Sequence, residues 1–192
     1  AYIENSTFVG NVFREMNNYY SSNGIGLQIW EIHDSFHGFV NNCSFIDNEG
    51  SILIADSVNN SRFINNSGKS SGGGIFVKAS LINNSLFMGN VNLYREGSGA
   101  YIGEGIASAD LILNSVFIKN KAAFGGAVAD TKEIHYSVFF NNTAEYEGDD
   151  IYSYDGDVDY SSNWWGDNQK PGSDRIFKFL GTLTLNDWVI MT

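Results

Sequence analysis

Apolar and polar residues follow one another in a short word that recurs along the chain. The word first occurs as NSTFVGN at residues 5–11 and returns as NCSFIDN, NSRFINN, NSLFMGN, NSVFIKN and YSVFFNN. In each copy serine or cysteine stands two residues before a phenylalanine, and asparagine stands three residues after it. Residues two apart share one face of a β-strand. The word therefore predicts a strand whose serine and phenylalanine face a core.

The copies keep this phase over most of the chain. The phenylalanines are Phe8, Phe45, Phe63, Phe87, Phe117 and Phe139, and the asparagines are Asn11, Asn48, Asn66, Asn90, Asn120 and Asn142. We expect the apolar residue directly after each phenylalanine to face the core as well. Asparagine tolerates left-handed backbone angles, so we expect it to form a corner. Stacked asparagines are then expected to hydrogen-bond to one another as a ladder.

A seventh, altered copy ends the series. We assign it to Val158, Ser161, Asn163 and Trp164, with Gly166 in the place of the asparagine. The apolar residues that follow, such as Trp188, are expected to cover the last coil, because an open end would expose a sheet edge.

A second strand is predicted in each coil, where small residues precede branched ones, as in GGAVAD at 125–130 and GDDIYSY at 148–154. The phenylalanines are 18 to 37 residues apart, and a constant word with variable spacing is typical of a solenoid with insertions. An antiparallel sandwich is the alternative, but it would not repeat one side chain in one phase six times. The sequence thus predicts an all-β, parallel β-helix of about seven coils.

Composition and charge narrow the class of protein. With 192 residues, 43% of them apolar, the chain can form one core, and we expect one domain with β-helix repeats over 1–175 and a capping segment over 176–192. A net charge of -11 argues against nucleic acid and anionic membranes as partners. No apolar run approaches the roughly 20 residues of a spanning helix. The chain opens inside a repeat, so we expect it to be excised from a longer protein.

Two repeated signatures carry a family resemblance. F-x-x-N and G-G-A-[IV], here Phe117–Asn120 and residues 125–128, resemble the repeats of chlamydial polymorphic outer-membrane proteins and of adhesin-like surface proteins of methanogenic archaea. The stretches NWWGDNQKPGSDRIF (163–177) and DWVIMT (187–192) resemble the ends of β-helix domains in the archaeal group. The resemblance covers essentially the whole chain. It implies a right-handed, pectin lyase-like β-helix at an extracellular cell surface, next to further domains of the same chain, with a role in adhesion.

Candidate binding residues lie in the longest stretches between copies, 12–39 and 91–111. Insertions of a solenoid often form its binding face, and exposed aromatic residues suit sugar stacking or a protein partner. We therefore expect a glycan or protein of a host-cell or microbial surface to be bound here. Alternatively, these stretches cover the core and the domain is a non-binding spacer. The candidate residues are Tyr19, Tyr20, Trp30, His33, Tyr94, Arg95 and Tyr101.

An enzyme is the remaining alternative. GDD at 148–150 resembles a motif of polysaccharide-degrading hydrolases of the same architecture, in which paired carboxylates act as acid and base. The Gly-His-Gly and Arg-Ile-Lys elements of those hydrolases do not occur here, so we expect no catalytic residue and no cofactor.

Metal sites are not expected either. HDSFH (33–37) would bind zinc only on a helix with a third ligand. DGDVD (155–159) would place three carboxylates on one face of a strand, but a calcium loop starting there needs an acid at position 166, which is glycine.

Overall fold

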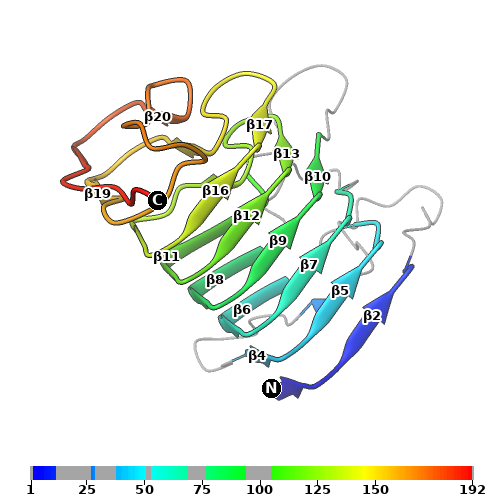
Figure 1. The fold of residues 1–192 in the computed structure, drawn as a ribbon. Helices are drawn as coiled ribbons and strands as arrows, with labels where there is room; N and C mark the ends of the chain where they lie inside the picture. Colours follow the sequence, from blue (N-terminus) through cyan, green and yellow to red (C-terminus); the bar gives the residue numbers. More distant parts are fainter. Residues whose placement is uncertain are drawn as a thin grey trace.

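The computed structural model describes residues 2–11, 27–28, 38–50, 53–68, 77–93 and 105–191. Among these residues there is no helix, and every strand pair is parallel, as Figure 1 shows for the stacked arrows of successive coils. In this described part, no helix has the length and hydropathy that would span a membrane. The prediction of an all-β chain with parallel, stacked strands is confirmed.

The described strands form three sheets along the stack, and we name the largest sheet A. It has 12 strands and holds the second strand of each coil together with the residues before the repeated word. Its strands are β1 (Tyr2–Glu4), β3 (Leu27–Gln28), β4 (Phe39–Asn41), β6 (Leu53–Asn59), β8 (Val77–Asn83), β11 (Ala107–Leu113), β14 (Val128–Ala129), β15 (Glu133–His135), β18 (Ile151–Ser153), β19 (Val158–Asp159), β20 (Ile176–Lys178) and β21 (Leu183–Thr184).

Sheets B and C follow the corners of each coil. Sheet B contains the repeated phenylalanines, and sheet C follows the asparagines. Sheet B consists of β2 (Thr7–Val9), β5 (Ser44–Ile46), β7 (Arg62–Ile64), β9 (Leu86–Met88), β12 (Val116–Ile118) and β16 (Val138–Phe140), and sheet C of β10 (Val91–Asn92), β13 (Lys121–Ala122) and β17 (Thr143–Ala144).

The repeated phenylalanines form one stack inside the molecule. Neighbouring ring centroids are 4.7–5.1 Å apart, and neighbouring ring planes differ by at most 7°. Phe45 to Phe139 are fully buried, whereas Phe8 at the first coil is half-buried. Each buried ring stabilises the fold by about 1.5–3 kcal/mol. The inward-facing prediction for serine and phenylalanine is confirmed.

The asparagine ladder is also confirmed. From Asn11 to Asn142, each side-chain Nδ2 donates to the Oδ1 of the asparagine in the next coil at 2.7–3.0 Å. The second Nδ2 hydrogen of Asn90 goes to the carbonyl of Phe63 in the preceding coil at 2.9 Å. The Oδ1 of Asn90 also accepts the backbone N–H of Asn66. The Asn90 carboxamide therefore satisfies two buried backbone groups of the preceding coil and also donates to the asparagine side chain of the following coil.

Two expectations about the word are wrong. The left-handed residue stands one position before the ladder asparagine, with φ of 53–66° at Gly10, Asp47, Asn65, Gly89, Lys119 and Asn141, and none of the ladder asparagines has a positive φ. The apolar residue after each phenylalanine faces outward, because the strand alternates; Val9 is 56% exposed and Phe140 36%. The left-handed residue after it turns the asparagine side chain back toward the interior.

The register predicted for the seventh copy is wrong by two residues. Ser161 and Gly166 put residue 163 in the phenylalanine position, whereas Trp165 continues the ring stack, at 4.8 Å and 12° from Phe139. Asn163 takes the place of the repeated serine, because its Oδ1 accepts the backbone N–H of Ser137 at 2.8 Å. The larger indole fits where the next phenylalanine ring would lie.

Residues 176–191 continue the stack rather than forming a separate layer. β20 pairs with β18 and β21 pairs with β19, both in parallel. Trp188 pairs with Asn163 across the end of the stack and packs against the core. The boundary between repeats and cap at residue 175 stays a prediction.

Replacing Asn90 by alanine should lower the free energy of unfolding by at least about 3 kcal/mol. The change leaves the Phe63 carbonyl and the Asn66 amides without partners, and each unsatisfied buried group costs about 1–3 kcal/mol. Urea unfolding followed by circular dichroism measures the effect. Asn65→Gly is the control, since Asn65 is exposed and left-handed, and it should change stability little; equal losses in both variants would contradict the ladder's role.

Candidate functional site

The seven predicted binding residues, Tyr19, Tyr20, Trp30, His33, Tyr94, Arg95 and Tyr101, lie outside the described residues, as does HDSFH at 33–37. Their role stays a prediction.

The carboxylates of DGDVD accept hydrogen bonds from backbone N–H groups in turns. Asp155 accepts the N–H of Gly156, and Asp157 accepts the N–H of Thr182, which holds the pKa of Asp157 below its ordinary value. Only Asp159 lies in a strand, so the expectation of three carboxylates on one strand face is wrong. In the described ranges, no group of three or more histidine, cysteine, aspartate or glutamate side chains could hold a metal ion.

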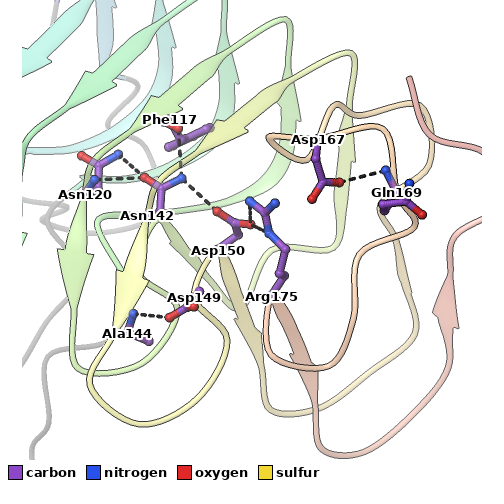
Figure 2. A network of polar contacts seen from close by, with 9 residues as sticks. All are labelled: Phe117, Asn120, Asn142, Ala144, Asp149, Asp150, Asp167, Gln169 and Arg175. Atoms are coloured by element: carbon purple, nitrogen blue, oxygen red, sulfur yellow. Dashed lines mark hydrogen bonds and ion pairs between the residues drawn. The ribbon is translucent and has the colours of Figure 1, made fainter. Parts of the chain in front are cut away.

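The asparagine ladder ends on a buried ion pair, shown in Figure 2. Asn142 Nδ2 donates to Asp150 Oδ1 at 3.0 Å, and the other carboxylate oxygen of Asp150 accepts from Nε and Nη2 of Arg175, with Nε at 2.6 Å. The side chain of Asp150 is fully buried, whereas that of Arg175 keeps 20% of its surface exposed. A carboxylate accepts hydrogen bonds and donates none, so it suits a ladder whose last member still has an N–H to give.

Burial raises the pKa of Asp150 to about 6. Arg175 and the hydrogen bond from Asn142 oppose this shift, and the nearby charge of Asp149 adds to it. Asp150 therefore titrates within a pH range in which most surface carboxylates are already charged.

Both carboxylates of the GDD motif hold the fold. Asp149 Oδ1 accepts the backbone N–H of Ala144 at 2.9 Å and so points away from Asp150, as Figure 2 shows. In the same view Asp167 accepts the N–H of Gln169 at 2.8 Å, which closes a turn. The pair Asp149 and Asp150 thus has partners that fix the last coils.

Arg175 was missed by sequence reasoning. Its guanidinium lies against Gly166, where an added Cβ would come within 3.1 Å of Nη1, and Gly166 has a φ of +84°. The backbone angle favours glycine after the tandem tryptophans, and a Cβ there would also crowd the arginine and the Phe139 carbonyl. A lone arginine 25 residues after Asp150 gives no signal until the last coil is placed.

A shallow groove of about 590 Å³ follows the corner between sheets A and B. It is lined by an exposed row of asparagines, one per coil, each with a φ of 48–52°. The row consists of Asn5, Asn42, Asn60, Asn84 and Asn114. Their side chains bond backward along the stack; for example, Asn84 Nδ2 donates to Asn60 Oδ1 at 2.8 Å. A carboxamide has two N–H groups, and among the described residues each of these side chains donates at most one side-chain hydrogen bond.

Two further residues add a cation and an aromatic ring to this corner. Arg62 contributes a cation to the groove and donates through Nε to Ser44 Oγ at 2.7 Å. Tyr136 occupies the asparagine position in the following coil, with a φ of 55°, and its side chain is 67% exposed. The sequence analysis assigned the repeated word to core and corner positions and no binding residue to it, although YSVFFNN has an aromatic residue where the other copies have asparagine.

Replacing Asp150 by asparagine should give a pH-dependent loss of stability. The ordinary pKa of Asp150 is 3.8, and its pKa in the folded protein is about 6. At pH values between these two, folded wild-type protein keeps a proton that the unfolded chain releases. The free energy of unfolding of wild type minus that of Asp150→Asn should therefore fall by on the order of 3 kcal/mol from about pH 4 to about pH 7. Urea titrations at several pH values measure this difference.

The variant Arg175→Gln provides the control for this titration. Without the cation the pKa of Asp150 should rise further. The decrease in the stability that Asp150 contributes should therefore extend to higher pH. A difference between wild type and Asp150→Asn that is constant or rises with pH would refute the assignment.

Comparisons of the chain with protein-family models, with curated proteins and with solved structures find no match. The function proposed below therefore rests on the side chains of this chain.

Proposed function

We propose that the chain is an adhesin-like module of an extracellular cell-surface protein, built as a right-handed parallel β-helix of about seven coils. It binds a glycan or protein on a host-cell or microbial surface and is flanked by further domains of the same chain. The observation that carries the proposal is the groove with its row of exposed carboxamides.

The groove suits an extended, uncharged polymer. Its row of asparagines places a carboxamide at the same point of successive coils, and a polysaccharide offers the same hydroxyl groups in every sugar unit. An acidic glycan fits less well, since the chain carries a net charge of -11. Tyr136, next along the row, gives an exposed ring on which a sugar can stack. A neutral glycan is therefore the ligand that this surface favours.

The insertions add to this proposal. Aromatic residues of 12–39 and 91–111, among them Tyr19, Trp30 and Tyr101, are proposed as further contacts. They supplement the groove, which is complete in the described residues.

A stiff spacer is the second candidate function. The ring stack runs from Phe8 to Trp165 and the ladder from Asn11 to Asn142, each without interruption. In a solenoid each coil contacts its neighbours only, and such a continuous stack makes a rod that could hold other modules away from a cell. We place no reaction at Asp149 and Asp150, whose carboxylates have structural partners.

A glycan array and a whole-cell binding assay with the isolated domain test the proposal. The double variant Asn60→Gly with Asn84→Gly should lose at least about ten-fold in affinity, because glycine accepts the left-handed angle but removes two groove carboxamides.

The matched control is Asn65→Gly with Asn141→Gly. These asparagines are also exposed, with φ of 53° and 54°, but lie at the corner between sheets B and C. The control should bind as wild type does. Equal affinity in all three proteins would exclude the groove, and no binding by any of them would favour the spacer.

A further inference from the structure

Within the described residues, strand β20 has one edge that pairs with no other strand. It ends the strand order of sheet A, with β18 as its single neighbour among the described strands. Ile151 N–H donates to Arg175 O and Phe179 N–H donates to Ser153 O, both at 3.0 Å. In a parallel pair the residues between these bonded positions direct their backbone groups to the other side. The N–H and C=O of Lys178 therefore point away from β18.

Two rows of aromatic rings end at this edge, on the outer face of sheet A. Tyr152 stacks on Phe177 with centroids 5.5 Å apart, and Tyr154 stacks on Phe179 at 5.2 Å. Each phenylalanine has one ring face against a tyrosine, and no described strand follows to cover the other. Phe179 is 56% exposed. In the part of the chain that the structure describes, the edge thus offers ring faces beside backbone groups that no strand pairs with.

A pocket adjoins the same edge on its inner side. It has a volume of about 450 Å³ and lies between β21 and the loop 170–173. Ile176, Leu183 and Leu185 give it an apolar floor that packs against the core, and Lys170 is the basic residue of its lining. The pocket has room for an apolar side chain of a bound segment above this floor.

The outer face around the rings is acidic. Asp155 and Asp157 are exposed and lie within three residues of Tyr154, and Asp174 is exposed and three residues before Phe177. The turn at 155–157 contacts the turn after Phe179, since an added Cβ on Gly181 would meet the Gly156 carbonyl. Lys178, the basic residue of β20, donates to the carbonyl of Leu180. A cationic side chain over the rings would thus find opposite charge.

We propose that the edge of β20 is a docking site for an extended segment of a partner protein in which apolar residues alternate with lysine or arginine. The segment adds a parallel strand to sheet A, with main-chain hydrogen bonds to Lys178. Its alternate side chains then face opposite ways. The apolar ones enter the pocket, and the basic ones lie over Phe177 and Phe179 within reach of the acidic turns. This site is separate from the proposed glycan groove and does not depend on it.

Fluorescence anisotropy with labelled peptides tests the proposal on the whole chain. An alternating valine–lysine octapeptide should bind, and its affinity should fall with added salt. Two probes should bind at least about ten-fold more weakly: a valine–glutamate octapeptide, and a block peptide of four valines and four lysines. Equal binding of the block and alternating peptides would show charge attraction alone and overturn the proposal.

Variants locate the site. Phe179→Ser removes an exposed ring, and Lys178→Pro removes the N–H at the open edge, which no described neighbour uses. Each should weaken binding of the alternating peptide by about ten-fold or more. Tyr2→Ser is the matched control, since Tyr2 is 77% exposed at the opposite end of the stack.

The outcomes separate the possibilities. Loss of binding in Phe179→Ser with unchanged binding in Tyr2→Ser supports the site, whatever Lys178→Pro does to folding. Unchanged binding in Phe179→Ser, or equal losses in Phe179→Ser and Tyr2→Ser, refutes it. Binding of a neutral glycan in competition with the peptide would also refute the assignment of a polypeptide partner.

Discussion

Each coil of this molecule has to satisfy the buried backbone groups of its neighbours, and the rest of the structure depends on that constraint. At the corner between sheets B and C, one side chain must accept from the preceding coil and donate both backward and forward, as Asn90 does. Of the short side chains, only the carboxamide of asparagine combines two donors with an acceptor. This requirement fixes the residue, its phase and the vertical alignment of the coils. Once the coils are aligned, the phenylalanine rings fall on top of one another.

The ladder has a direction. Each asparagine donates toward the C-terminal end of the stack, so its last member needs an acceptor that has nothing further to donate. Asp150 meets that need, and its burial is tolerated because Arg175 lies against it. The GDD motif thus has a physical role in this chain that requires no reaction.

What the sequence could predict follows from this repetition. Phe87, Asn90 and their counterparts could be assigned because one word in one phase admits few other arrangements. The outward position of Met88 follows from strand alternation, but its hydrophobic side chain suggested a core position. The left-handed position has no fixed residue type, since glycine, aspartate, asparagine and lysine all occur there. The predicted alignment of the seventh copy differs from the observed one by two residues at Trp165, because this copy keeps almost none of the word. The ion pair of Arg175 and the groove could not be predicted from the sequence, since both form only when coils distant in sequence lie side by side.

The ladder also determines how the molecule would respond to mechanical load. In the described residues, successive coils along the asparagine ladder are held together by ring contact, backbone pairing and carboxamide hydrogen bonds, and in a solenoid each coil contacts its neighbours only. A force that separates the two ends of the stack would therefore act on these links in series. The molecule would yield one coil at a time, with each step releasing a length of chain set by the spacing between copies, from 18 to 37 residues. Because the insertions differ in length, each step would extend the chain by a different amount, whereas the force needed for each step would stay nearly the same.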